Sequence, residues 1–281
     1  MKLIVVIPTY NEAANIGRIL TRILAVDPAY HALVVDDNSP DGTAAVVAQR
    51  AASDARIHLL LRRHERGFGT AVRDGFLEAL RRGAALIGQM DADGSHDPAM
   101  FRDMSARILR DDADVVIGSR YVGGGAIQGW GPLRYANSHV ANRIARWVTG
   151  VALSDTTNGL RLFRREVLET IDLNALLSRG YSVILETNYL AQRAGFRLRE
   201  LPITFHRRAA GMSKMGLREI SRFCLFLLRL RLQHPALRSP ERSPGGILPV
   251  AEFADSPPQP HPSGPLPPGS RDKPRRSQIP A

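Results

Sequence analysis

The sequence predicts an α/β fold in which a mostly parallel central sheet is flanked by helices and followed by a disordered C-terminal tail. Short apolar runs rich in β-branched residues, of which residues 3–7 are the first, alternate with longer segments whose apolar residues recur at helical spacing. Several of these runs end in polar, acidic loops. After Pro235 the composition changes to proline, serine, glycine and arginine, which cannot bury a core.

The first half of the chain contains four predicted strands separated by helices. Each strand is a short apolar run of the kind that a parallel sheet buries on both faces. The predicted strands cover residues 3–7, 32–35, 57–61 and 84–90. Amphipathic helices are predicted at residues 13–25, from Thr43, which we expect to cap its helix, and from the loop at 67–70 to residue 81. This alternation predicts parallel strands joined by helical crossovers.

The second half of the chain has a less regular pattern. Strands are predicted at residues 114–118 and 196–205, and a loop with a short strand is predicted at 155–164. Helices are predicted at residues 133–148, from Gly180 onward and at 217–232, with a glycine-rich loop at 123–131. We therefore divide the chain into a main domain at residues 1–214, an amphipathic helix at 215–235 and a tail at 236–281.

Composition and charge exclude several classes of protein. Hydrophobic residues make up 44% of the 281 residues, which is ample for a core. The single Cys224 excludes an intrachain disulfide framework, and its apolar neighbours favour a buried structural thiol. We expect neither a signal peptide nor a membrane span, because no apolar run approaches roughly 20 residues. The net charge of +11 fits anionic partners, but no nucleic-acid-binding motif is present, so we expect no nucleic acid.

The main chemical signal is the acidic stretch that follows the fourth predicted strand. Asp91 and Asp93 are two residues apart, and side chains at that spacing point the same way in extended backbone. Two such carboxylates repel each other unless a cation lies between them, and Mg²⁺ or Mn²⁺ suits their oxygen atoms. The stretch therefore predicts a metal–diphosphate site. The alternative is an acidic turn that ends the strand before Pro98 starts the next helix.

Two other predicted strands end in polar loops, after Ile7 and after Val35. The carboxyl ends of parallel strands meet at one edge of a sheet, where ligands of such folds bind. The glycine spacing of nicotinamide-binding folds is absent after the first strand, and the phosphate-binding motif GxxxxGK[ST] does not occur. The convergence of three polar strand ends is therefore the main indication of a ligand site.

Three basic features lie in the second half of the chain. The predicted helix at 133–148 carries Arg134 and Ser138 on one side, although a solvated surface charge is the alternative for Arg134. The loop at 206–214 has cations that fit a diphosphate, or it is a solvated surface loop. The helix at 217–232 is amphipathic and basic, which fits either a membrane interface or packing against the domain.

The polar loops resemble those of family 2 glycosyltransferases and, within that family, those of the polyprenyl-phosphate (dolichol-phosphate) mannose synthases. The resemblance covers roughly residues 1–235. The matching segments are residues 8–12 (Pro-Thr-Tyr-Asn-Glu), 36–43 (Asp-Asp-Asn-Ser-Pro-Asp-Gly-Thr), 66–71 (Arg-Gly-Phe-Gly-Thr-Ala), 91–96 (Asp-Ala-Asp-Gly-Ser-His), 118–121 (Gly-Ser-Arg-Tyr) and 211–214 (Gly-Met-Ser-Lys). The resemblance implies a GT-A-type nucleotide-sugar-binding fold, with residues 1–214 as its catalytic domain.

The resemblance also implies roles for individual residues. The residues that would hold the guanine nucleoside are Pro8, Tyr10, Glu12, Val35 and Asp37. Those that would meet the diphosphate and sugar are Asp91, Ala92 and Asp93, with Asp93 as the principal ligand of Mg²⁺ or Mn²⁺ and Asp91 beside it. Those that would close over the donor are Arg208 and Lys214. Those that would receive a lipid phosphate are Arg120, Arg134 and Ser138, and Arg120 would act with Asp93 in catalysis.

The implied activity is inverting transfer of mannose from GDP-mannose to a polyprenyl monophosphate. Two departures weaken the sugar assignment, because Gly94 replaces an apolar residue and residues 158–161 replace Thr-Gly-Phe-Arg. No paired membrane hairpins are expected, so the resemblance implies a peripheral protein at the cytoplasmic face of the membrane, or one with a membrane-anchored partner subunit. The alternatives are a related glycosyltransferase with UDP-glucose or another donor or acceptor, and a non-catalytic nucleotide-sugar-binding protein.

Overall fold

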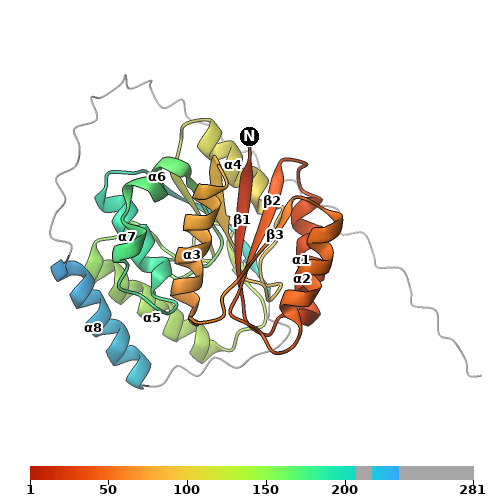
Figure 1. The fold of residues 1–281 in the computed structure, drawn as a ribbon. Helices are drawn as coiled ribbons and strands as arrows, with labels where there is room; N and C mark the ends of the chain where they lie inside the picture. Colours follow the sequence, from red (N-terminus) through yellow and green to blue (C-terminus); the bar gives the residue numbers. More distant parts are fainter. Residues whose placement is uncertain (207–216, 234–281) are drawn as a thin grey trace, which may run out of the picture. The chain divides into compact units, whose positions relative to one another are not determined.

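A seven-stranded sheet forms the centre of the computed structural model, which describes residues 1–206 and 217–233 (Figure 1). In spatial order the strands are β3 (Ile57–Leu61), β2 (Tyr30–Asp36), β1 (Leu3–Thr9), β4 (Leu86–Gln89), β7 (Arg161–Arg164), β5 (Val115–Ser119) and β8 (Leu198–Pro202). Neighbouring strands are parallel except at β7, which is antiparallel to both β4 and β5. The predicted α/β fold with a mostly parallel sheet is therefore confirmed.

Helices cover both faces of the sheet (Figure 1). One face is covered by α1 (Ala13–Leu24), α2 (Thr43–Ser53) and α4 (Met100–Leu109). The other face is covered by α3 (Phe68–Arg81), α5 (Pro132–Thr149), α6 (Arg165–Thr170), α7 (Val183–Arg193) and α8 (Leu217–Gln233), with a short 3₁₀ helix at Leu173–Ala175. Within α8, Leu227 and Leu230 are fully buried against this second core.

The two cores follow from the alternation of side chains along each strand. In β1, Leu3, Val5 and Ile7 belong to the core beneath α1, α2 and α4. Ile4 and Val6 belong to the core beneath α3 and its neighbours. Successive residues of a strand point to opposite faces, so a strand covered on both sides has to be apolar throughout. This is why the sequence of β1 reads as one continuous apolar run.

Three local predictions need correction. The predicted strand at 196–205 is two strands, β8 and β9 (Thr204–Phe205), and β9 pairs with β6 (Ala126–Ile127) inside the predicted glycine-rich loop. Between them Ile203 donates its N–H to Ser119 and accepts one from Ala126, so the chain passes from one sheet to the other. Thr43 does not cap α2, because it is the first helical residue and Gly42 precedes it with φ of +90°.

Pro98 also lies ahead of the helix it was expected to start, since α4 begins at Met100 after Ala99.

None of the helices within residues 1–206 and 217–233 combines the length and the apolar character needed to span a bilayer. The predicted tail at 236–281 and the basic loop from residue 207 onward lie outside the described residues.

A pair of stacked histidines joins β2 to β3 and makes stability depend on pH. Nδ1 of His31 lies 3.2 Å from Nε2 of His58, and Nη1 of Arg82 lies 3.1 Å from Nδ1 of His58. Burial, together with the charges of Arg82 and Lys2, lowers the pKa of His58 to about 4. The unfolded chain therefore binds this proton near pH 6.5, whereas the folded chain resists it until about pH 4.

We expect this histidine to lower the free energy of unfolding by about 1–2 kcal/mol as the pH falls from 6.5 to about 4, because solvent screens part of the effect at this partly exposed ring. Urea unfolding measured across this range checks the prediction. The His58→Phe variant keeps an aromatic ring but cannot titrate, so its stability has to fall less steeply with acidification. An identical slope in the two proteins would contradict the assignment.

Candidate active site

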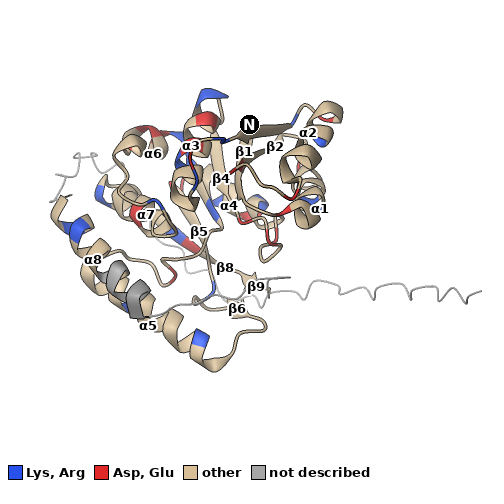
Figure 2. Cartoon of the chain, turned by 60° about the horizontal axis from the view of Figure 1, so that its bottom comes forward, with Lys and Arg blue, Asp and Glu red and all other residues tan. Residues whose placement is uncertain are grey.

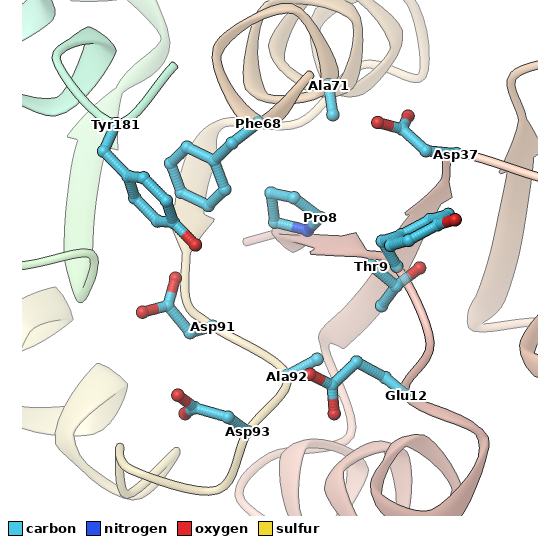
Figure 3. Close-up of a pocket in the computed structure, with 11 residues that line it drawn as sticks. Pro8, Thr9, Glu12, Asp37, Phe68, Ala71, Asp91, Ala92, Asp93 and Tyr181 are labelled. Carbon is cyan, nitrogen blue, oxygen red and sulfur yellow. The ribbon is translucent and has the colours of Figure 1, made fainter. Parts of the chain in front are cut away.

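Polar loops at the carboxyl ends of β1, β2 and β4 surround a pocket, together with the start of α3 and the segment before α7 (Figure 3). The residues that line it are Pro8, Thr9, Tyr10, Glu12, Asp37, Phe68, Ala71, Asp91, Ala92, Asp93 and Tyr181. Asp37 lies across the pocket from Asp91 and Asp93. The three strand ends that the sequence singles out therefore converge on one site.

Asp37 is held in place by two donors. Nη1 of Arg62 donates to its Oδ1 at 2.7 Å, and the N–H of Gly67 donates to its Oδ2 at 2.8 Å. Burial raises the pKa of Asp37, and the N–H of Gly67 and the charge of Arg62 act against that rise. Arg62 is itself buried and donates to Thr70 at 2.7 Å. The Asp37 carboxylate therefore has a fixed orientation at the pocket wall.

The other acids of the same loop have structural roles. Asp36 is fully buried and accepts hydrogen bonds from the hydroxyl and N–H of Ser39. Asp41 accepts the N–H of Ala13 at 2.9 Å and that of Thr43 at 3.0 Å. These bonds satisfy N–H groups at the starts of α1 and α2 that have no partner inside the helices. Asp41 thus joins the first two strand-end loops.

The loop after β4 orients both of its carboxylates. Oδ1 of Asp93 accepts the N–H of Ser95 at 3.0 Å and its hydroxyl at 2.6 Å. Between them Gly94 has φ of +76°, a left-handed conformation that glycine adopts without strain. Nε2 of His96, which is buried, lies 3.5 Å from Oδ2 of Asp91. The glycine that departs from the family pattern therefore serves the turn that places Asp93.

A hard divalent cation fits this pair of acids. Asp91 and Asp93 line the same pocket and supply oxygen atoms, which Mg²⁺ and Mn²⁺ prefer. Across residues 1–206 and 217–233 there is no group of three or more His, Cys, Asp and Glu side chains that could hold a metal ion. An ion bound by two carboxylates takes its other ligands from water and phosphate oxygens, so the site suits a metal that arrives with a diphosphate.

Arg120 directly follows β5 and forms a buried ion pair. Its Nε and Nη2 donate to the two carboxylate oxygens of Asp155 at 2.6 and 2.7 Å, and Nη2 also donates to Thr157 at 2.9 Å. Asp155 is fully buried. Burial opposes the charge of Arg120, but the hydrogen bonds and charge of Asp155 outweigh it and raise the pKa. Asp91 is close enough to add to this rise.

Arg134 and Ser138, both in α5, lie beside the ion pair of Arg120 and Asp155. The guanidinium of Arg134 stacks on the ring of Trp130 at 4.2 Å, and the guanidinium of Arg120 lies 5.1 Å from the same ring. One turn later in α5, Ser138 accepts a hydrogen bond of 2.7 Å from the hydroxyl of Tyr121. Arg120, Arg134 and Ser138 are therefore brought together, as their predicted common role requires.

The remaining predicted site residues are a core residue, a partly exposed pocket residue and two residues outside the described part of the chain. Val35 is fully buried in the core and does not line the pocket, so its side chain is out of reach of a nucleoside there. Tyr10 is 48% exposed, with the guanidinium of Arg66 5.3 Å above its ring. Arg208 and Lys214 lie outside the described residues.

Comparison with known proteins identifies the family. Residues 4–172 match the model of the family described as "Glycosyl transferase family 2". The chain belongs to this family. It is 44% identical over 216 residues to a polyprenol monophosphomannose synthase of Mycolicibacterium smegmatis. This alignment covers 76% of the chain and 80% of the synthase. The chain is 40% identical over 216 residues to an undecaprenyl-phosphate mannosyltransferase of Micrococcus luteus, covering 77% and 88%. The predicted resemblance is therefore confirmed.

Solved structures share the fold of this glycosyltransferase. Glucosyl-3-phosphoglycerate synthase from Mycobacterium tuberculosis, solved with Mn²⁺ and UDP, is 17% identical with a TM-score of 0.57, covering 83% of the chain and 79% of that protein. The mannosyltransferase PcManGT from Pyrobaculum calidifontis, solved with GDP-Man and Mn²⁺, is 19% identical with a TM-score of 0.51, covering 83% and 71%. The predicted GT-A-type fold is confirmed.

Sequence reasoning missed an aromatic wall of the glycosyltransferase pocket. Phe68 and Tyr181 stack with ring centroids 4.4 Å apart, on the side of the pocket next to Asp91 (Figure 3). The segment before Tyr181 is tied down by the fully buried Glu186, which accepts N–H groups at residues 177 and 178, and by Gly69, whose N–H donates to residue 179. Phe68 stands inside the recognised 66–71 segment, but no local pattern pairs it with a residue beyond 170.

Arg161 could not be identified as a site residue from the sequence; it is fully buried and close enough to Asp91 for their charges to interact. It donates to the side chains of Gln89, Thr187 and Asn188. Burial lowers the pKa of Arg161 to about 9, and the charge of Asp91 acts in the opposite direction. A buried cation next to Asp91 favours the ionised carboxylate. The departure from Thr-Gly-Phe-Arg at residues 158–161 keeps the arginine of that pattern as Arg161.

Gly159 lets the chain pass directly behind Asp91. A Cβ atom at residue 159 would lie 2.9 Å from Oδ1 of Asp91 and 3.2 Å from its Cγ. We expect Gly159→Ala to displace the carboxylate and lower kcat about 100-fold, the effect of misplacing a positioned group by about 1 Å. Gly17→Ala in α1 is the matched control, since its Cβ would meet the nearest atom at 3.6 Å. Equal kcat values with matching melting temperatures would contradict the role of residue 159.

Proposed function

We propose that this glycosyltransferase transfers mannose from GDP-mannose to a polyprenyl monophosphate with inversion, releasing GDP. The observation that carries the proposal is the position of the acids Asp91 and Asp93 in one pocket with Asp37, next to a cluster of two arginines. Two anionic substrates need such an arrangement, with a metal for one phosphate and fixed cations for the other. The names of the 44% and 40% identical relatives support mannose as the sugar and a polyprenyl phosphate as the acceptor.

The donor half of the proposal assigns the nucleoside to the side of Asp37. Its carboxylate, oriented by Arg62, is suited to accept N–H groups of a guanine base, and the ring of Tyr10 offers a stacking surface. Pro8, Glu12 and Ala92 complete this side. Asp93 and Asp91 would hold Mg²⁺ or Mn²⁺, and this ion would neutralise the diphosphate as it leaves. The PcManGT structure, solved with GDP-Man and Mn²⁺, has the same fold.

The acceptor half assigns the lipid phosphate to Arg120, Arg134 and Ser138. In the reaction a phosphate oxygen attacks C1 of mannose while the bond from C1 to the GDP oxygen breaks. A phosphate monoester has a second pKa of about 6, so near pH 7 it is largely a dianion and needs no general base. The chain's task is then to position two anions and offset their repulsion. Arg208 and Lys214 would close over the donor.

An apolar surface on α5 and α8 supports peripheral binding at the cytoplasmic face of a membrane, or contact with a membrane-anchored partner subunit. The exposed apolar side chains on these two helices include Leu133, Val140, Leu225, Leu228 and Leu232. Arginines stand on the same two helices (Figure 2), and Arg231 of α8 donates to the carbonyl of Val148 in α5 at 2.6 Å. Apolar side chains among cations suit an anionic lipid interface.

One assay tests the proposal. The purified full chain is incubated with Mg²⁺ or Mn²⁺, a short-chain polyprenyl phosphate and GDP-mannose, UDP-glucose or GDP-glucose, and the lipid product is identified by mass. We expect a hexosyl phospholipid from GDP-mannose only. Preferential use of UDP-glucose would favour the alternative donor. Nucleotide binding without any product would favour a non-catalytic nucleotide-sugar-binding protein.

A further inference from the structure

We propose that Trp130 is a positioning residue that holds Arg134 next to Arg120 and so builds the binding site for the acceptor phosphate. This inference rests on the proposed function, in which the two arginines receive that phosphate. Trp130 lies in the short loop between β6 and α5, within the predicted glycine-rich loop at 123–131. Its contacts give that aromatic residue a role.

The ring of Trp130 lies against both guanidinium groups. The Cζ atom of Arg134 is 4.2 Å from the ring centroid and that of Arg120 is 5.1 Å away. Two guanidinium groups repel each other, and an aromatic face attracts each of them through its quadrupole. Trp130 therefore lowers the cost of gathering two positive charges before their anion arrives. Tryptophan is the aromatic side chain with the strongest such attraction.

The position of Trp130 is determined by the backbone around it. The N–H of Gln128 donates to the carbonyl of Phe205 at 2.9 Å, so the loop continues the pairing of β6 with β9. The edge of the Trp130 ring meets the ring of Phe205, with centroids 5.6 Å apart and planes at 72°. Phe205 in turn lies 5.5 Å from the guanidinium of Arg120. Trp130 and Phe205 thus both lie within about 5.5 Å of the guanidinium of Arg120.

The same strand pair links this cluster to the metal loop. The N–H of His206, directly after β9, donates to the carbonyl of Ser95 at 3.2 Å, and Nδ1 of His206 lies 3.0 Å from Oε1 of Gln128. Ser95 is the residue whose N–H and hydroxyl orient Asp93. The loop that carries Trp130 is therefore attached to the loop that carries Asp93, which sets the distance between the donor and acceptor sites.

Trp130 also has a donor that the fold does not use. Its Nε1 atom is buried, and no acceptor lies within hydrogen-bond reach of it in the described part of the chain. Buried N–H groups nearly always have a partner, so one left over beside two cations indicates a place for an anion. A phosphate oxygen bound beside the two guanidinium groups would be placed to accept a hydrogen bond from this N–H.

Trp130→Leu and Trp130→Phe test the inference by their effects on the two substrates separately. Trp130→Leu removes the aromatic face, and we expect the KM for a short-chain polyprenyl phosphate to rise about tenfold, as loss of one charge-assisted or cation–π contact predicts. Trp130→Phe keeps a weaker face without the N–H, so its acceptor KM has to lie between those of wild type and Trp130→Leu. The KM for GDP-mannose should stay within about twofold of wild type in both.

The chain offers a matched control in its other tryptophan. Trp147 is 83% exposed in the last turn of α5, so Trp147→Phe should leave both KM values unchanged. An unchanged acceptor KM in Trp130→Leu, or an equal rise in donor KM, would overturn the inference. If Trp130→Leu melts early, Trp130→Phe decides, because a native melting temperature with wild-type acceptor KM refutes the role. Failure of wild type to glycosylate the lipid would instead refute the proposed function.

Discussion

Replacing Asp93 with alanine should lower the rate of sugar transfer by about 10³-fold or more. The carboxylate is the predicted principal ligand of a divalent ion that neutralises the departing diphosphate, and loss of such charge stabilisation costs several kcal/mol, at tenfold in rate per 1.36 kcal/mol. Ser95 orients Asp93 through two hydrogen bonds of 3.0 and 2.6 Å, so the side chain is prepared for one position. Initial rates with saturating nucleotide sugar and metal provide the measurement.

Asp97→Asn is the control for Asp93→Ala. Asp97 lies in the same loop, but its carboxylate is about half exposed and pairs with Arg22 at 3.0 Å on the surface. We expect less than a twofold change in rate. A titration of Mn²⁺ in the presence of GDP adds a readout independent of turnover, since Asp93→Ala should weaken metal binding. Retained activity together with unaltered metal affinity would rule out Asp93 as a ligand.

Replacing Asp155 with asparagine should destabilise the fold by about 3–5 kcal/mol. Asp155 is fully buried, and it accepts three hydrogen bonds from Arg120, two from the guanidinium and one from the backbone. Removing one partner of a buried ion pair leaves an uncompensated charge in a region of low dielectric constant, which is the reason for the large cost. Urea unfolding monitored by circular dichroism measures the change.

Two comparisons make the Asp155 prediction specific. Asp112→Asn breaks a half-exposed ion pair with Arg107 and should cost less than about 1 kcal/mol. The double variant Asp155→Leu with Arg120→Met removes both charges, so we expect it to be more stable than Asp155→Asn. If Asp155→Asn unfolds at the same urea concentration as wild type, Arg120 does not depend on this carboxylate for its charge.

Much of the fold could be predicted from the sequence because the decisive signals are local. Each apolar run of the first half contains a strand, with the expected bounds at residues 57–61 and bounds shifted by one or two residues at one or both ends elsewhere, and the spacing of apolar residues predicts α1 to within one residue. The direction of the short β7 strand was harder to predict, since four residues between a loop and the start of α6 carry no signal for parallel or antiparallel pairing. Its antiparallel pairing with β4 and β5 arises from where the chain returns to the sheet.

In the candidate site, too, some residues could be predicted from local sequence and others depend on tertiary contacts. Asp37, Asp91 and Asp93 were recognised because they directly follow strands, and the structure places all three in one pocket. The side chain of Val35 faces the core, because successive residues of a strand point to opposite sides, so the predicted nucleoside contact of this residue stays a prediction for its backbone. Tyr181 was missed, because its position depends on Glu186 and on the stacking partner Phe68 more than a hundred residues earlier.

Local sequence patterns are enough to predict the succession of strands and helices along the chain, the three polar loops at strand ends and the family of this glycosyltransferase. Those properties depend on residues that are neighbours in the chain, where period and polarity can be read directly. The tertiary structure decided which cation meets which anion. It buries Arg120 against Asp155, places Arg161 near Asp91 and brings Trp130 to two guanidinium groups. Such contacts depend on distance in space, which sequence separation does not reveal.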